Sequence, residues 1–509
     1  MTIHRDRAAS RRPNILFIMA DDHAARAIGC YGSGLNATPA IDRIADGGVR
    51  LDHCYVTNSI CTPSRAAILT GTYNHVNGVT TLRTPLDNRL PNVAKHLQRG
   101  GYQTAIVGKW HLGEGPAHAP TGFDHHAVLP GQGAYFDPEM IVNGTRTATS
   151  GYVSDVITDG CLDWLEHRDP DRPFFLMCHH KAPHRPWDPH PKNRGLYLDD
   201  VPVPPSFDDD YRNRGRAAAE ARIRVRDDLT YRDLGLVTLD IGEPTGKTGA
   251  DRKVPTPEDL SRFRLTDADT GEVFTFVDHD ELALFKYQRY LKRYLRTVAS
   301  LDESVGRLLD YLDDAGIADD TLVVYTSDQG FFLGEHGWFD KRFMYEQSFQ
   351  MPFVARLPGE IEPGSVSRDF ARNVDFAPTF LDCAGLQVPT YMQGRSLRPI
   401  LTGDAPSDWS QLAYHRYWMH CDATHNIRAH YGIRDHRYKL IYWYNEGYGL
   451  PGTNGGGQER EWELFDLDED PLELVDVHDD PAYAEVRADM LRKLDATMLE
   501  IGDVPEHPA

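Results

Sequence analysis

The chain has 509 residues, 40% of them hydrophobic, and a formal net charge of −22. This length fits two or three average domains, or one large domain with a smaller second one. The fraction of hydrophobic residues is sufficient for a sizeable core. The charge argues against general nucleic-acid binding and against binding to an anionic membrane surface. The seven cysteines are widely spaced and odd in number, so no disulfide framework is predicted.

The N-terminal segment favours a cytoplasmic protein without a signal peptide. Residues 1–13 are polar and rich in arginine. The apolar run that follows, Ile15–Ala20, has the length of a strand and is too short to span a membrane. We therefore expect a soluble chain with no membrane partner.

Four apolar runs are expected to form buried parallel strands of an α/β sheet. Each run leads directly into residues with polar or charged side chains. Ligands of such sheets bind at the carboxyl ends of the strands, so these polar residues are the candidates for a functional site. The runs cover residues 14–20, 104–107, 173–178 and 321–326.

Acidic residues follow the first and the last of these runs. Asp21 and Asp22 are adjacent carboxylates, which repel each other unless a cation compensates them or they turn to solvent. Asp328 and Gln329 repeat the pattern, since both offer side-chain oxygens. Hard oxygen ligands favour Ca²⁺ or Mg²⁺. We therefore interpret the residues that follow these two runs as ligands of one divalent metal ion.

Basic and titratable residues follow the other two runs. Lys109 and His111 point to one face if the backbone is extended, which suits anion binding and proton transfer. A surface lysine with a packed histidine is the alternative. The third run leads into a cluster of such side chains between His179 and Trp187, which indicates a site, although each residue singly could lie at the surface.

Cys61 begins the segment Cys61-Thr62-Pro63-Ser64-Arg65, which is expected to open a short helix that ends at Gly71. A helix N-terminus favours an anion, because its backbone N–H groups are unpaired and its dipole is positive there. Arg65 returns to the same side of the helix one turn later. The thiol of Cys61, the anion-binding helix N-terminus and the guanidinium of Arg65 would then lie close together. A buried core cysteine is the alternative.

This segment matches Cys-x-Pro-Ser-Arg, and over essentially its whole length the chain resembles the type I sulfatases of the alkaline phosphatase superfamily. Further segments stand in the order and at the spacing of that family. They are Ala20-Asp21-Asp22, Gly108-Lys109-Trp110-His111, Lys181-Ala182-Pro183-His184, Ser327-Asp328-Gln329-Gly330 and Asp340-Lys341.

The resemblance implies an alkaline-phosphatase-like α/β sandwich. It would have a central, mostly parallel sheet and a smaller C-terminal α+β subdomain with a short antiparallel sheet. The composition agrees with such a division, because Tyr, Trp and His become dense from about Trp409. We therefore expect a catalytic domain over residues 1–408, with a polar insertion at about 188–280, and a subdomain over residues 409–509.

The resemblance also implies the nucleophile and the metal. In this family a formylglycine-generating enzyme oxidises the cysteine to formylglycine, whose hydrate attacks the ester, so Cys61 is the expected nucleophile. Ca²⁺, in preference to Mg²⁺, would bind Asp21, Asp22, Asp328 and Gln329, joined by an oxygen of the modified Cys61. Many relatives carry Asn where Gln329 stands, and Gln keeps the carbonyl on a longer side chain.

The family also implies roles for the remaining residues. Arg65 would orient the hydrate, while Lys109, His111, His184 and Lys341 would surround the sulfate. A cation with Lys and Arg offsets the charge of a sulfate ester, which otherwise repels nucleophiles. His184, with Lys341, would give the proton to the leaving oxygen. His111 would deprotonate the remaining hydroxyl, so that sulfate is eliminated and the aldehyde re-forms.

The expected function is a sulfatase that hydrolyses a sugar O-sulfate or an aryl sulfate. Residues 329–342 are similar to sulfatases of the N-acetylglucosamine-6-sulfate or mucin type. The alternatives are a phosphonate monoester or phosphodiester hydrolase of the same superfamily, and a non-catalytic sulfate-binding protein with unmodified Cys61. Four C-terminal residues could contact the unsulfated part of a substrate or could be surface residues: His415, Arg416, His425 and Arg428.

Overall fold

The computed structural model describes residues 12–237 and 256–508. The segment 1–11, where no signal peptide is expected, and residues 238–255 of the expected polar insertion lie outside the described residues. Among the helices of the described ranges, none is long and apolar enough to cross a membrane.

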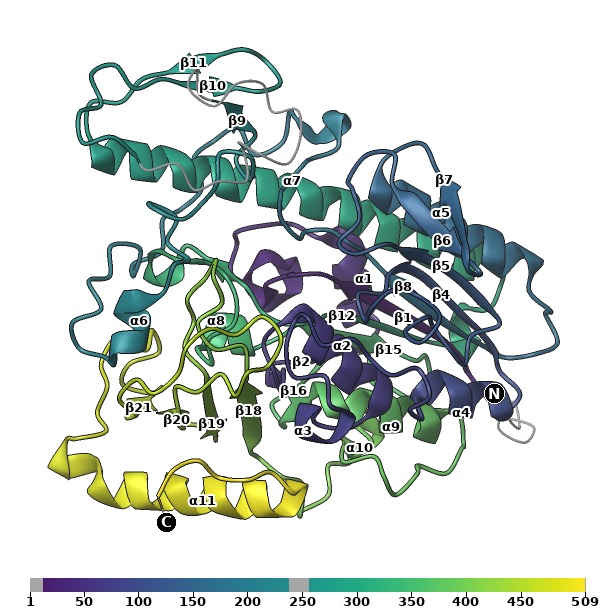
Figure 1. Cartoon of the computed structure of the whole chain (residues 1–509). Helices are drawn as coiled ribbons and strands as arrows, with labels where there is room; N and C mark the ends of the chain where they lie inside the picture. The colour runs from purple at the N-terminus through teal and green to yellow at the C-terminus, as the bar shows by residue number, and fades with distance from the viewer. Residues whose placement is uncertain (1–11, 238–255, 509) are drawn as a thin grey trace, which may run out of the picture.

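A ten-stranded sheet forms the centre of the molecule (Figure 1). From one edge to the other its strands are β16 (Ser365–Ser367), β2 (Val49–Leu51), β15 (Phe353–Arg356), β12 (Thr321–Ser327), β1 (Asn14–Ala20), β8 (Phe174–His179), β4 (Gln103–Lys109), β5 (His125–Leu129), β6 (Glu139–Val142) and β7 (Thr145–Ala148). The strands from β12 to β5 pair in parallel, whereas β15, β6 and β7 join antiparallel. The four predicted apolar runs are thus the parallel centre of the sheet.

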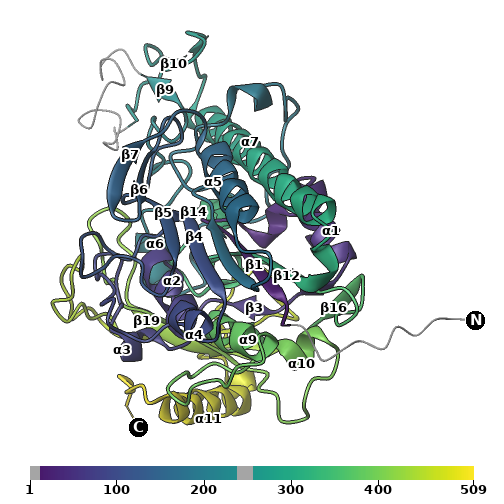
Figure 2. The same ribbon diagram turned by 90° about the vertical axis from the view of Figure 1, so that its right-hand side faces the viewer.

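Helices cover both faces of this sheet, as Figure 2 shows. One face carries α1 (Pro39–Asp46), α5 (Val153–His167) and α7 (His279–Asp314), and the other carries α2 (Cys61–Thr70), α4 (Val93–Arg99) and α9 (Phe376–Cys383). Leu16 and Ile18 of β1 pack into the first core, while Phe17 and Met19 pack into the second. A strand that is apolar at every position suits this place, because successive side chains point to opposite faces and both faces are covered.

The C-terminal part carries its own antiparallel sheet, as the resemblance implies. Its strands are β18 (Ala413–Tyr417), β19 (His430–Arg434), β20 (Tyr438–Trp443) and β21 (Glu461–Asp466). One face packs on α11 (Ala484–Ile501) through Met490, Leu494 and Met498. The division of the chain after residue 408 stays a prediction.

Short elements complete the described part. They are α3 (Asn74–Asn77), α6 (Arg216–Glu220), α8 (Glu346–Phe349), α10 (Arg398–Leu401), β3 (Cys54–Tyr55), β9 (Leu236–Val237), β10 (Leu265–Asp267), β11 (Val273–Phe274), β13 (Phe332–Leu333), β14 (Phe339–Asp340) and β17 (Ala371–Arg372). The described part of the polar insertion contains α6 and the small sheet β9–β11, and α7 follows it.

Candidate active site

The carboxyl ends of the parallel strands bring the predicted acidic residues together. Ala20 at the end of β1 lies opposite Ser327 at the end of β12, so the residues that follow the two strands are neighbours. Ligand oxygens of Asp21, Asp22 and Asp328 lie within 4.8 Å of one another, and all three side chains are fully buried. The parallel register therefore converts two distant sequence motifs into one cluster of carboxylates.

The carboxylate cluster keeps buried oxygen atoms available for a further ligand. Burial and the neighbouring carboxylates together raise the pKa of Asp22 to about 6 and that of Asp328 to about 7, although Lys341 and Arg65 act in the opposite direction. Burial opposes ionisation of Asp21 too, but Lys109 and Arg65 hold its pKa well below the usual range. Asp21 Oδ1 and Gln329 Oε1 are buried without a hydrogen-bond partner. Four hard oxygen donors with two unpartnered atoms fit a divalent cation such as Ca²⁺.

Three buried cations surround the carboxylates. Lys109 Nζ donates to Asp21 Oδ2, and Lys341 Nζ donates to both oxygens of Asp22 at 2.7 and 2.6 Å. Arg65 Nε donates to Asp328 Oδ2 at 3.0 Å. Burial disfavours the charged form of Lys341, yet Asp22 raises its pKa above the ordinary value. A set of buried basic side chains of this kind is suited to holding an anion.

Cys61 is the first residue of α2 and is buried. It lies at the expected helix start, and Gly71 ends the helix in the left-handed conformation, with φ 67°. Ligand atoms of Cys61, Asp21 and His184 lie within 4.8 Å of one another. The helix end does not create a thiolate, because burial raises the pKa of Cys61 above its ordinary value. The unmodified thiol is therefore a poor nucleophile in this setting.

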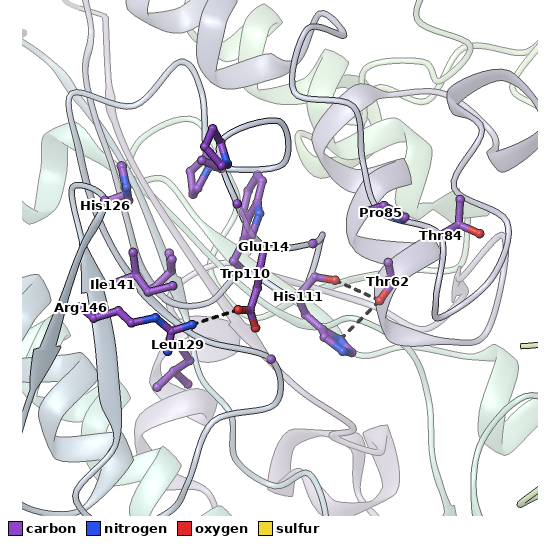
Figure 3. A pocket seen from close by; sticks show the side chains of 18 of the residues that line it. Thr62, Thr84, Pro85, Trp110, His111, Glu114, His126, Leu129, Ile141 and Arg146 are labelled. Atoms are coloured by element: carbon purple, nitrogen blue, oxygen red, sulfur yellow. Dashed lines mark hydrogen bonds and ion pairs between the residues drawn. The ribbon is translucent and has the colours of Figure 1, made fainter. Parts of the chain in front are cut away.

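Two predicted histidines flank Cys61. His111 has φ 54° and lies beside Thr62, whose Oγ1 donates to the His111 carbonyl at 2.9 Å (Figure 3). His184 Nδ1 lies 2.5 Å from the Arg185 carbonyl, and its Nε2 lies 3.7 Å from Asp22 Oδ2. Burial lowers the pKa of both histidines well below the ordinary value. Both rings are therefore neutral at neutral pH without substrate, and each can accept a proton.

A cavity of about 290 Å³ opens above Cys61. His184 and Lys341 line it, and so do residues to which we gave no role from the sequence. Those residues are Gln132, Arg185, Asp233, Asp340 and Arg342.

Gln132 is one of these additional residues. Its Oε1 accepts a hydrogen bond from Lys109 Nζ, so Gln132 and Asp21 together hold the ammonium group. It belongs to the loop between β5 and β6. The sequence around it carries no signal beyond a pair of glycines, Gly131 and Gly133.

The rim of the cavity is a network of charges. Arg185 Nε donates to Asp233 Oδ1 at 3.0 Å, and Arg185 Nη1 lies 3.6 Å from Asp340 Oδ2. Asp340 and Arg342 both have left-handed backbones, with φ 76° and 97°, a costly conformation that is concentrated at functional sites. His425 Nε2 lies 3.5 Å from both Asp340 Oδ2 and Arg342 Nη2.

Of the four C-terminal candidates, only His425 lines this cavity. His415 is buried and accepts a hydrogen bond from the Ser59 backbone N–H at 3.0 Å. Arg416 pairs with Asp503 at 2.7 Å, and Arg428 pairs with Glu220 at 2.7 Å. His415, Arg416 and Arg428 thus have partners within the fold, and none of them is a simple surface residue, because all three are buried.

Comparisons with known proteins agree with this geometry. The family described as Sulfatase matches residues 13–386, and the C-terminal family of N-sulphoglucosamine sulphohydrolase matches residues 334–500. The N-acetylglucosamine-6-O-sulfatase of Bacteroides thetaiotaomicron is 42% identical over 505 residues, covering 97% of this chain and 88% of that protein.

Solved structures show the same likeness. A protein solved in complex with its substrate D-glucosamine-2-N,6-O-disulfate has a TM-score of 0.88 and 40% identity, over 98% of this chain and 100% of that one. The phosphonate monoester hydrolase from Silicibacter pomeroyi has a TM-score of 0.70 and 23% identity, over 96% and 95% of the two chains. At that identity the second likeness shows the fold alone.

The family match spans most of the chain and includes every motif on which the resemblance was based. The predicted fold class and the predicted family are both confirmed. The chain belongs to the sulfatase family and is a sulfuric ester hydrolase.

Proposed function

We propose that this sulfatase removes the 6-O-sulfate of a glucosamine residue, either N-acetylated or N-sulfated. The observation that carries the proposal is a 290 Å³ cavity with Cys61 in its wall, buried cations beside it and a charged rim. The relatives support the sugar, because one is named an N-acetylglucosamine-6-O-sulfatase and another was solved with D-glucosamine-2-N,6-O-disulfate.

The metal ligands in this proposal are Asp21, Asp22, Asp328 and Gln329. Their buried carboxylate and amide oxygens match the hard ligands of Ca²⁺, which we propose in preference to Mg²⁺. A divalent cation bound there would offset the charge of the ester and polarise a sulfate oxygen. Lys109 and Lys341 hold Asp21 and Asp22 in place for this role through hydrogen bonds.

The proposed nucleophile is formylglycine, made from Cys61 by a formylglycine-generating enzyme. Its hydrate would supply a hydroxyl in place of the buried thiol, whose raised pKa keeps it protonated. Arg65 lies one helical turn from position 61, and Asp328 fixes its guanidinium at 2.9 Å. It would therefore orient the groups at that position without moving during turnover.

The two histidines would move the protons. His184 lines the cavity and is held through Nδ1, which leaves its Nε2 to act on a leaving oxygen. When an anionic ester binds, the added negative charge favours the imidazolium, which can then give that proton to the departing alcohol. His111 lies beside Thr62 at the start of α2, where it can accept the proton of the remaining hydroxyl.

The rim would recognise the sugar. Asp340, Arg342 and His425 present one acceptor and two donors close together, and the Arg185–Asp233 pair adjoins them through Asp340. Sugar hydroxyls both donate and accept, so such a set can bind neighbouring hydroxyls of one ring. A substrate that lacks a matching hydroxyl would leave buried charges unpaired, which costs about 1–3 kcal/mol per group.

Release of sulfate from defined substrates tests the proposal. We expect the enzyme, matured with a formylglycine-generating enzyme, to desulfate N-acetylglucosamine-6-sulfate with a higher kcat/KM than 4-nitrophenyl sulfate. A phosphodiester and a phosphonate monoester with the same leaving group should be turned over more slowly than either. Equal or faster turnover of the phosphorus esters would contradict the sulfatase assignment of the site. Preference for a 4-sulfated sugar would contradict the 6-sulfate.

A further inference from the structure

Part of the polar insertion lies outside the reaction cavity but encloses a segment that lines it. Residues 206–225, which we call the clamp segment, pack around residues 334–342, which we call the lysine segment. The reaction proposed above makes no use of the clamp segment. The lysine segment ends in three residues that line the cavity, namely Asp340, Lys341 and Arg342. A contact that fixes the lysine segment therefore acts on the reaction site.

Main-chain hydrogen bonds join the two segments. The Val225 N–H donates to the Gly337 carbonyl at 2.8 Å. The Phe339 N–H donates to the Ile223 carbonyl at 2.9 Å. Gly337 has φ 69°, and a Cβ at this position would lie 2.6 Å from the Phe207 carbonyl oxygen. A side chain here would push the two backbones apart, so the close contact depends on glycine.

His336 is buried at the centre of this contact, and the clamp segment binds both its backbone and its ring. Its N–H donates to Ser206 Oγ at 3.1 Å, and its carbonyl accepts the Tyr211 hydroxyl at 2.6 Å. Its Nδ1 lies 3.2 Å from Asp209 Oδ2 and 3.1 Å from Arg214 Nη1. His336 has φ 57°, a conformation that a residue other than glycine adopts at a cost. The hydrogen bonds from the clamp segment offset that cost.

The lysine segment needs such support, because its backbone is strained on both sides of Lys341. Asp340 and Arg342 have φ 76° and 97°, and such conformations persist only where the surrounding structure fixes them. The hydrogen bond from Phe339 to the clamp segment holds the residue directly before Asp340. Lys341 Nζ then reaches the two oxygens of Asp22 at 2.7 and 2.6 Å. The clamp segment thus helps to set the direction from which Lys341 enters the site.

We propose that the polar insertion contributes to catalysis through this contact, with Ser206, Tyr211 and His336 as positioning residues for Lys341. The inference rests on the proposed function, in which His184 gives a proton to the leaving oxygen as its bond to sulfur breaks. Lys341 and His184 line the same cavity, so the ammonium can stabilise the charge that develops on that oxygen. The oxygen of a sugar alcohol needs this help, whereas a 4-nitrophenolate leaves without it. Displacement of Lys341 should therefore slow a sugar sulfate more than an aryl sulfate.

Turnover of two esters with different leaving groups tests the inference. Tyr211→Phe removes the hydrogen bond to the His336 carbonyl but keeps the ring, which stacks on Trp338 with the ring centroids 5.5 Å apart. We expect its kcat for N-acetylglucosamine-6-sulfate to fall about tenfold and its kcat for 4-nitrophenyl sulfate to change less than about twofold. Ser206→Ala removes the bond to the His336 N–H and should shift the ratio of the two kcat values in the same direction. Loss of folded protein alone would lower both values equally, so the ratio separates positioning from stability.

Tyr102→Phe is the matched control. Tyr102 is also buried, and its hydroxyl donates to the Pro13 carbonyl at 2.9 Å, but it precedes β4 at the end of the sheet opposite the reaction site. This variant should change neither kcat. An unchanged ratio in Tyr211→Phe and in Ser206→Ala would overturn the inference while the wild-type enzyme still releases sulfate from the sugar. Absence of sulfate release from both esters by the mature wild-type enzyme would instead overturn the proposed function, and the inference with it.

Discussion

The protein contains two buried clusters of opposite charges, and they differ in how completely their atoms are paired. The C-terminal ion cluster consists of Glu346, Arg434, Lys439 and Glu473. Lys439 Nζ contacts Glu473 at 2.5 Å and Glu346 at 2.8 Å, and Arg434 Nε donates to Glu346 at 2.8 Å. Glu473 Oε2 accepts the Glu346 backbone N–H at 2.7 Å. Two carboxylates here meet two cations.

The reaction site has more charges but leaves some of them incompletely matched. Burial opposes ionisation of Glu346 as well, yet Arg434 and Lys439 lower its pKa to about 2, whereas the pKa of Asp328 rises to about 7. Asp21 Oδ1 and Gln329 Oε1 lack hydrogen-bond partners, although both are buried. Unpaired buried polar groups cost stability, and a ligand that pairs them removes this cost. We infer that the C-terminal ion cluster stabilises the fold, while the reaction site keeps groups free for ligands.

The largest expected effect is on turnover and concerns Cys61. Cys61→Ala should lower kcat/KM for a sulfate ester by about 10⁴-fold or more, because no other group at the site can replace the nucleophile. Cys54→Ala is the matched control, since Cys54 is also buried but lies on β3 outside the reaction cavity. It should keep its activity. Full activity in Cys61→Ala would refute the covalent mechanism.

The second prediction is that only the reaction site, and not the C-terminal ion cluster, responds to removal or addition of a divalent metal. Treatment with EDTA should lower activity by about 10³-fold, because the charge of the ester is then no longer offset. Ca²⁺ at about 100 times its dissociation constant should raise the free energy of unfolding by about 2.7 kcal/mol. Asp328→Asn should abolish this stabilisation, measured by thermal unfolding with and without Ca²⁺. Glu473→Gln in the C-terminal ion cluster should retain it, and equal losses in both variants would contradict the assignment of the ligands.

Two lysine variants, one in each cluster, should have opposite effects: one should mainly lower stability and the other should mainly lower activity. Lys439→Met leaves two buried carboxylates short of a partner and should lower the free energy of unfolding by about 3–5 kcal/mol. Its kcat/KM per folded molecule should stay within about twofold of wild type. Lys109→Met should lose about 10³-fold in kcat/KM with a smaller loss of stability. Urea unfolding together with kinetics decides between these expectations, and a large activity loss in Lys439→Met would remove the distinction.

The smallest expected effect is a pH dependence of stability. The pKa of Glu346 is lowered from 4.5 to about 2, so its stabilising contribution is complete above about pH 4.5 and is lost as the pH falls toward 2. The raised pKa of Glu473 acts in the opposite direction and reduces the net effect. Between about pH 6 and pH 3, we expect Glu346→Gln to lose less unfolding free energy than wild type, by about 2 kcal/mol. If the variant and the wild type lost the same unfolding free energy between about pH 6 and pH 3, Arg434 and Lys439 would not be lowering the pKa of Glu346.

The parts of the site that follow strands could be predicted from the sequence. Asp21, Lys109 and Asp328 stand at the ends of apolar runs, and parallel pairing places strand ends at one edge of the sheet. The pairing of Ala20 with Ser327 then fixes which motifs meet. Local sequence and sheet geometry were sufficient for these residues, and the family resemblance added their roles.

Residues that reach the cavity from loops could not be predicted in the same way. Gln132 and Asp233 come from connections whose paths depend on packing far away in the chain. Arg416 and Arg428 were candidates from the sequence but do not line the cavity. Arg416 pairs with Asp503, which follows α11, and Arg428 pairs with Glu220 on α6. The thiol of Cys61 illustrates a competition that sequence alone does not weigh. The helix end favours an anion, but complete burial has the larger effect and raises the pKa of Cys61.

The mass of the tryptic peptide Leu51–Arg65 from an active preparation tests the central claim most directly. The account predicts that position 61 carries an aldehyde in place of the thiol, and that the modified fraction rises with activity when a formylglycine-generating enzyme is co-expressed. Cys54 lies in the same peptide and should remain a thiol, which makes it an internal reference. An intact thiol at position 61 in a preparation that releases sulfate at full rate would contradict the account.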